Sequence, residues 1–248
     1  MKNLGSDRSY REERGEFLCD GNKLLKDAVA SGADILAVLS ALELPLPFEL
    51  PAETKIYRAD RALINSLSPL KNAQDTLFVC KICESRPPLH TAIRIPGSKS
   101  GRIAGILLDH MQDPGNVGAI IRTADAFGID AVLLSDGCAD PYNPKTLRAS
   151  MGAIFRQRFA QMDASELFAL KKDGARFIGA TARVDCRDIR EINLDGAVIA
   201  IGNEGRGLSD GVLALCEELM TIPIASVCES LNASAAAAII MWEAARKE

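Results

Sequence analysis

The chain has 248 residues, of which 48% are hydrophobic and 25% charged, a composition typical of a globular protein and not of a disordered or fibrous one. Its 29 basic and 33 acidic residues give a net charge of −4, so the total charge indicates no nucleic-acid partner, and a polyanion has to be bound by a local basic surface. The uncharged stretch 230–242 is shorter than the ~20 residues that a membrane-spanning helix needs, and no signal segment opens the chain, so no membrane partner and a cytoplasmic location are expected.

The first part of the chain has the pattern of a small α/β domain. Residues 1–14 are polar and charged, and we expect them to form a flexible tail. Short apolar runs at 17–19, 35–39, 55–57 and 77–82 then alternate with helical patterns such as 22–30. These elements predict a domain over residues 15–95. Residues 96–102 are rich in Pro, Gly and Ser and are expected to form a linker.

The second part, residues 103–248, alternates apolar strand candidates with helical patterns. The strand candidates are 103–108, 131–134, 177–180, 197–201 and 220–222, which is typical of a mostly parallel sheet covered on both faces. Polar or glycine-rich segments follow four of them, at 109–116, 181–183, 202–207 and 223–232. Because open α/β sheets bind ligands at the carboxyl ends of their strands, we predict the functional site there.

The segment after the first of these strands predicts a helix. Asn116 precedes an apolar stripe at helical spacing that ends at Gly128, so Asn116 is expected to be its N-cap. At about 100° per residue, Arg122 lies roughly 165° from the centre of the stripe. Taken alone, Arg122 has the position of a solvent-facing arginine on an amphipathic helix.

Two further segments have side chains suited to a ligand site. The sequence from Gly202 to Gly207 matches neither GxGxxG nor a P-loop, so no nicotinamide or ATP fingerprint is present. Its glycines still allow backbone groups to face a ligand, with Glu204 as a hydrogen-bond acceptor, although a plain turn has the same pattern. Ser230 and Asn232 are natural caps of an alanine-rich helix that runs toward Trp242.

The cysteines and histidines suggest no metal site. Seven cysteines is an odd number, so reduced and mostly buried thiols are expected rather than a disulfide framework. Cys80 and Cys83 form a single CxxC pair with only His90 nearby, so no metal is expected. His110 follows Asp109 at a predicted strand end, but without an accompanying nucleophile it is interpreted as a loop histidine.

Three of these segments together resemble the motifs of the SpoU/TrmH family of RNA ribose 2′-O-methyltransferases, within the SPOUT class. Residues 116–124 resemble the first motif, 202–208 the second and 230–234 the third, in the family's order and spacing. The match covers about 103–242, and 16–82 more weakly resembles a small ribosomal-protein-like substrate-binding domain. Asp20-Gly21 stands where a Glu-Gly pair is usual, and Ile224 replaces a common methionine, which leaves the substrate open.

The resemblance implies a SPOUT-type parallel sheet with a deep trefoil knot, S-adenosyl-L-methionine as methyl donor, and a homodimer whose active site is completed across the interface. It also implies which residues hold the donor: Thr181, Ala182, Gly202, Asn203, Gly207, Ile222 and Leu231. The catalytic set by motif match is Arg122, Glu204, Ser230 and Asn232, with Asn116 supporting the first loop. Because its high pKa opposes a neutral guanidine, Arg122 is better suited to contact the target's phosphate and hydroxyl than to act as a base.

The expected partner is RNA, either ribosomal or transfer RNA, and the substrate-binding domain favours ribosomal RNA. Two stretches, 85–108 and 141–162, contain basic residues and no acidic ones. From the second we predict contacts of Lys145, Arg148, Arg156 and Arg158 with the RNA backbone, although an acid-free solvated face has the same pattern. Two alternatives remain open: a non-catalytic RNA-binding or assembly protein with the same fold, and a nucleotide-dependent oxidoreductase, which lacks the expected glycine spacing.

Overall fold

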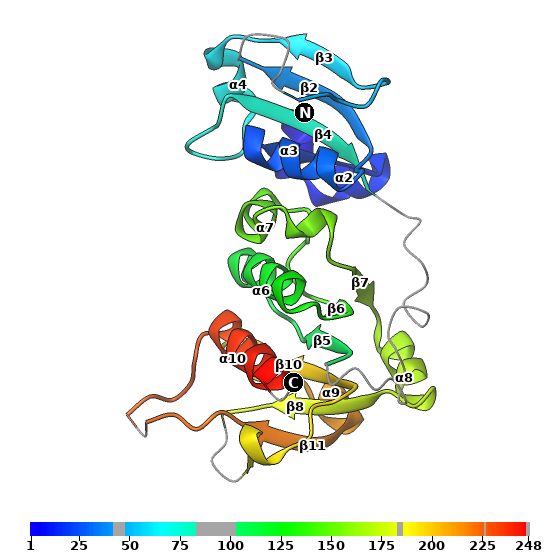
Figure 1. The fold of residues 1–248 in the computed structure, drawn as a ribbon, viewed down its shortest axis with the longest axis vertical. Helices are drawn as coiled ribbons and strands as arrows, with labels where there is room; N and C mark the ends of the chain where they lie inside the picture. Colours follow the sequence, from blue (N-terminus) through cyan, green and yellow to red (C-terminus); the bar gives the residue numbers. More distant parts are fainter. Residues whose placement is uncertain (42–47, 83–102, 183–185, 226, 247–248) are drawn as a thin grey trace. The chain divides into compact units, whose positions relative to one another are not determined.

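The structure, a computed structural model, describes residues 1–41, 48–82, 103–182, 186–225 and 227–246 (Figure 1). The chain divides into two compact units. Unit 1 comprises Met1–Ser85 and Asp140–Arg156, and unit 2 comprises Arg86–Ala139 and Gln157–Glu248. The predicted linker at 96–102 lies outside the described residues.

Unit 1 contains a four-stranded sheet in the order β1-β4-β2-β3. Its strands are β1 (Glu16–Asp20), β2 (Ile35–Ser40), β3 (Lys55–Arg58) and β4 (Thr76–Lys81), with helices α3 (Asn22–Ala30) and α4 (Arg61–Leu67). Strand β4 is antiparallel to both β1 and β2, and β3 is parallel to β2. The four strands and the helix predicted for this region are therefore confirmed.

Residues 1–14 form two helices, α1 (Lys2–Ser6) and α2 (Arg8–Arg14), so the expectation of a flexible tail is wrong. Leu4 is buried, and the buried Arg11 guanidinium donates to the Asp140 carboxylate at 2.6 and 2.9 Å and to the Leu4 carbonyl at 2.6 Å. The partner of Arg11 lies 129 residues away in the sequence. The polar composition of the segment therefore could not reveal that it is anchored.

Residues 140–156 belong to unit 1, although the sequence places them inside the second domain. They form α7 (Pro144–Ser150) and a 3-10 turn (Ala153–Phe155), and α7 packs on β1. The ring of Phe17 on β1 lies 4.6 Å from that of Tyr142 and 6.2 Å from that of Phe155, measured between centroids. This aromatic cluster attaches the segment to the sheet of unit 1.

Unit 2 contains a seven-stranded sheet in the order β7-β6-β5-β10-β8-β11-β9, in which every strand pair is parallel. The strands are β5 (Gly105–Leu108), β6 (Ala131–Ser135), β7 (Phe159–Met162), β8 (Arg176–Ala180), β9 (Arg187–Asp188), β10 (Ala197–Ile201) and β11 (Cys216–Thr221). Strands β5, β6 and β10 are buried along their whole length, which explains their uninterrupted apolar sequences. The predicted α/β class and parallel sheet are confirmed, and the trefoil knot stays a prediction.

The helices of unit 2 are α6 (Pro114–Phe127), α8 (Ala164–Lys172), α9 (Asp210–Leu215) and α10 (Ala233–Arg246), with a 3-10 turn at Ile189–Glu191. Helices α6 and α10 pack against each other (Figure 1). Helix α6 is followed by Gly128 as its C-cap, with φ of 64°, so the predicted stop is confirmed. Its N-cap is Asp113, whose carboxylate accepts from the Asn116 N–H at 2.8 Å, so the prediction of Asn116 as the cap is wrong. In the described part of the chain, no helix has the length and apolarity needed to cross a bilayer.

Candidate active site

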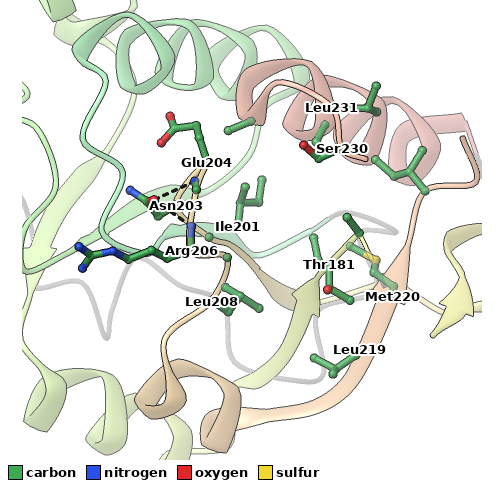
Figure 2. Close-up of a pocket in the computed structure, with 18 of the residues that line it drawn as sticks. Thr181, Ile201, Asn203, Glu204, Arg206, Leu208, Leu219, Met220, Ser230 and Leu231 are labelled. Carbon is green, nitrogen blue, oxygen red and sulfur yellow. Dashed lines mark hydrogen bonds between the residues drawn. The ribbon is translucent and has the colours of Figure 1, made fainter. Parts of the chain in front are cut away.

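The loops that follow β8, β10 and β11 enclose a cleft of about 550 Å³ (Figure 2). These three strands are neighbours in the sheet, so their carboxyl ends open at the same edge. The lining consists of residues 180–182, 201–208, 213, 219, 220, 222, 224, 230, 231, 233 and 236. All seven residues assigned to the donor by resemblance are among them: Thr181, Ala182, Gly202, Asn203, Gly207, Ile222 and Leu231.

The loop after β10 is a closed turn. Asn203 and Gly207 exchange backbone hydrogen bonds of 3.0 and 2.9 Å, and the Asn203 carboxamide oxygen accepts from the N–H groups of Gly205 and Arg206 (Figure 2). Gly207 has φ of 71°, and a Cβ on Gly202 would lie 2.2 Å from the carbonyl carbon of Gly207. Glycine is therefore required at both positions, and the turn presents Glu204 at its tip.

Asn116 connects the three predicted motifs through its side chain. Its Nδ2 donates to Glu204 Oε1 at 2.6 Å, and its Oδ1 accepts from Asn232 Nδ2 at 3.1 Å. Asn232 Oδ1 in turn accepts from the backbone N–H groups of Ser234 and Ala235, so Asn232 caps α10 as predicted. The structure thus brings Asn116, Glu204 and Asn232 together.

Ser230 and Arg122 have different positions relative to the cleft. Ser230 lines it together with Glu204, whereas Thr181 and Met220 lie on the opposite side (Figure 2). Arg122 lies on the exposed side of α6, away from the buried Val117–Ala124 stripe, as the helical angle predicts. It does not line the cleft, and its side chain makes no hydrogen bond or ion pair with the residues that the structure describes. Within a single chain, Arg122 therefore does not belong to the hydrogen-bonded group of Asn116, Glu204 and Asn232.

A buried carboxylate that is not among the predicted site residues joins the segment after β10 to the ends of β5 and β6. Asp109, at the end of β5, is inaccessible to solvent and accepts from the Ser209 N–H at 2.6 Å and from Ser135 Oγ at 3.1 Å. Its Oδ1 also lies 2.7 Å from Nδ1 of His110, whose backbone has φ of 53°. The His110 carbonyl accepts from Asn203 Nδ2 at 2.9 Å. The only sequence signal for this network is an acid directly after a fully apolar strand.

The described cysteines are free thiols, three of them buried. Cys138 donates to the Leu108 carbonyl and accepts from the Met111 N–H, and burial raises the pKa of its thiol. Burial also raises the pKa of Cys216 to about 11. Among the described residues, no three His, Cys, Asp or Glu side chains are placed to hold a metal ion; Cys83 and His90 lie outside them.

The four residues predicted to bind RNA are all exposed but belong to different units. Lys145 and Arg148 lie on α7, and Arg156 follows the 3-10 turn, so these three belong to unit 1. Arg158 belongs to unit 2.

The chain is similar in sequence to known RNA methyltransferases. A sequence model of the SpoU rRNA Methylase family matches residues 104–242. The 23S rRNA (guanosine(2553)-2'-O)-methyltransferase RlmP of Bacillus subtilis is 31% identical over 95% of this chain and 90% of its own length. A 23S rRNA (uridine(2479)-2'-O)-methyltransferase of Streptomyces viridochromogenes is 28% identical over 98% of this chain and 87% of its own.

Solved structures of this family have a similar fold over nearly the whole chain. The SpoU methyltransferase AviRb from Streptomyces viridochromogenes in complex with AdoMet has a TM-score of 0.82 and 27% identity, covering 99% of this chain and 95% of that one. A protein of the TrmH family from Porphyromonas gingivalis has a TM-score of 0.84 and 29% identity, covering 100% of this chain and 97% of that one. The chain belongs to the SpoU rRNA methylase family.

Proposed function

We propose that the protein transfers a methyl group from S-adenosylmethionine to a ribose 2′-hydroxyl of structured RNA, and that the RNA is ribosomal. The observation that carries this function is the Asn116 side chain, which joins Glu204 and Asn232 beside a cleft built by three neighbouring strand ends. Two relatives that match almost the whole chain are 23S rRNA 2′-O-methyltransferases, which favours ribosomal over transfer RNA. We place the reaction in the cytoplasm, where free thiols such as those described persist.

The cleft suits an adenosine-containing donor. Its volume is within the range of small-molecule sites, and its walls combine apolar side chains with the backbone of the 202–207 turn. Leu219, Met220 and Leu231 offer apolar surface to an adenine ring (Figure 2). The absence of a Cβ at Gly202 lets the turn close against Gly207, so part of the cleft wall is backbone rather than side chain. We assign Thr181, Ala182, Gly202, Asn203, Gly207, Ile222 and Leu231 to donor binding.

When bound, the donor supplies an electrophilic methyl group on a sulfonium. The residues of the chain then have to hold a ribose hydroxyl in line with that methyl and exclude competing water. Asn116 holds the Glu204 carboxylate and the Asn232 amide in fixed positions, and the exposed Ser230 hydroxyl can donate to or accept from the ribose. Arg122 binds the target phosphate as a permanent cation.

Because Arg122 lies outside the cleft of its own chain, we propose that a second copy of the chain completes the site. Helix α10 exposes Ala235, Ile239 and Trp242, which lie on one side of the helix, beside α6. Trp242 is 57% exposed and Ile239 39% exposed, and the Trp242 ring contacts Phe127 of α6. An apolar helical surface of this kind suits a homodimer contact through α6 and α10.

Two activity measurements test the proposal. Arg122→Ala should abolish methylation of a 23S rRNA transcript while the affinity for S-adenosylmethionine in isothermal titration stays near the wild-type value. Arg122→Ala and Glu204→Ala chains, each inactive alone, should regain activity when coexpressed if the two side chains act from different subunits. Wild-type turnover by Arg122→Ala refutes its assignment, and a protein that binds RNA but not S-adenosylmethionine is a non-catalytic binder.

A further inference from the structure

Four exposed cations lie on two helices of unit 1 that are distant in sequence. Helix α3 carries Lys23 and Lys26, and α7 carries Lys145 and Arg148. Each pair has i, i+3 spacing, so its two side chains extend from the same side of their helix. Only the α7 pair lies in an acid-free stretch of the sequence, because Asp20 and Asp27 flank Lys23 and Lys26.

The fold places these two helices beside each other. Both α3 and α7 pack on β1, at one edge of the four-stranded sheet. Directly after α7, Gly152 lies against α3, since a Cβ on Gly152 would be 2.4 Å from Asp27 Oδ2. Asp27 follows Lys26 in the sequence, and Gly152 lies four residues after Arg148, beyond the end of α7. The two pairs of cations therefore lie on neighbouring elements of unit 1, and we call the exposed sides of these two helices the α3–α7 surface.

The positive charge of this surface is not neutralised by ion pairs. In the described ranges of the chain, none of the four side chains forms an ion pair or a hydrogen bond. Other cations are paired: Arg11 with Asp140, and Arg187 with Glu218. Asp27, the one acid within α3, is half-buried. In a chain with a net charge of −4, four unpaired cations that face solvent together create a local positive potential.

We infer that the α3–α7 surface binds the phosphodiester backbone of the RNA substrate. This inference rests on the proposed function, because it is that function which makes RNA the partner. Unpaired lysine and arginine side chains on helices bind phosphates without reading sequence, and so position the RNA while other groups select the nucleotide. The surface adds Lys23 and Lys26 to the predicted contacts and assigns this part of RNA binding to unit 1.

The test compares three charge-neutralised proteins. They are K23Q/K26Q, K145Q/R148Q and, as a matched control, K55Q/R58Q on β3. Strands β1 and β3 are the opposite edges of the sheet, so the control removes the same charge about three strand spacings, roughly 14 Å, away. Lys55 and Arg58 are also exposed, and neither forms an ion pair with another described residue.

Filter binding of a 23S rRNA transcript is measured over a salt series with each protein. Each cation that no longer neutralises a phosphate should reduce the slope of log K against log salt by about 0.7–0.9, so each α3–α7 variant should reduce it by about 1.5 and their combination by about 3. The control should keep the wild-type slope. Unchanged slopes in both α3–α7 variants, or an equal reduction in the control, overturn the inference.

Steady-state kinetics separate this inference from the proposed function. The α3–α7 variants should raise KM for RNA and keep the wild-type kcat and affinity for S-adenosylmethionine. If the wild-type protein binds the transcript with a slope that depends on these cations but does not methylate it, the surface is supported and the proposed function fails. If the wild type methylates the transcript and the variants keep its KM, the surface is wrong and the function stands.

Discussion

Replacement of Asn116 by alanine should separate donor binding from methyl transfer. The Asn116 side chain is buried and holds Glu204 and Asn232 through two hydrogen bonds, but it does not line the cleft. Its removal therefore changes none of the residues that we assign to S-adenosylmethionine binding. The substitution instead frees one carboxylate and one amide from their fixed positions.

The size of the effect follows from those two bonds. The 2.6 Å bond to Glu204 involves a carboxylate, and because Glu204 is exposed and water can replace the missing donor, we take the lower end of the range for charged partners, about 1.5 kcal/mol. The 3.1 Å bond to Asn232 is neutral and contributes about 0.5 kcal/mol. Together, about 2 kcal/mol corresponds to a decrease in kcat/KM of roughly 30-fold.

The assay is single-turnover and steady-state methylation of a 23S rRNA transcript, with S-adenosylmethionine affinity measured by titration calorimetry. Thr123→Ala is the matched control, since it removes a side-chain hydrogen bond, from Oγ1 to the Ala119 carbonyl, on the same helix but away from the cleft. It should retain wild-type kinetics. A folded Asn116→Ala protein with the wild-type kcat/KM would contradict the role given to this bridge, and so would a decrease confined to donor affinity.

Three further outcomes are expected. Gly202→Ala should weaken S-adenosylmethionine binding at least tenfold in calorimetry, since its Cβ would lie 2.2 Å from backbone of Gly207; unchanged affinity would show that the turn opens at little cost. Asp140→Ala should lower the free energy of unfolding in urea by about 3 kcal/mol, because it leaves the buried Arg11 guanidinium without its carboxylate, and an unchanged midpoint would refute this. Burial raises the pKa of the Cys216 thiol from 9.0 to about 11, so the contribution of this shift to stability is complete below pH 9 and is lost as the pH rises toward 11. Cys216→Ala should therefore make the free energy of unfolding less dependent on pH between 9 and 11. A variant with the wild-type pH profile would contradict this.

The regular elements of the fold are predictable where the side-chain pattern is decided locally. The fully buried strands β5, β6 and β10 have uninterrupted apolar sequences, and α3 has the bounds that its apolar spacing predicts. The start of β11 is not predictable in this way, because Glu217 and Glu218 interrupt its apolar pattern. Both acids are paired with cations of other elements, Lys171 and Arg187, and no local pattern shows such partners.

The site is predictable to a smaller extent. Motif order locates Glu204, Asn232 and Asn116, but the function of Asn116 as a bridge depends on loops that are 88 and 116 residues apart from it in the sequence. The sequence shows Asp109 only as the neighbour of a loop histidine, because its burial and its bond to Ser209 arise only when the sheet is assembled. The sequence also could not show that residues 140–156 belong to unit 1, because their contacts with Phe17 form only in the folded chain.

The chain passes between the two units three times, after residues 85, 139 and 156. Unit 1 is thus built from two separate chain segments and cannot be removed by a single cut in the chain. A fragment ending at residue 85 would lack Tyr142 and Phe155, and the remainder would carry those rings with no counterpart for them. Exchanging unit 1 between related enzymes therefore requires two more junctions than an ordinary amino-terminal fusion. A chimera that leaves residues 140–156 in the wrong unit should be insoluble.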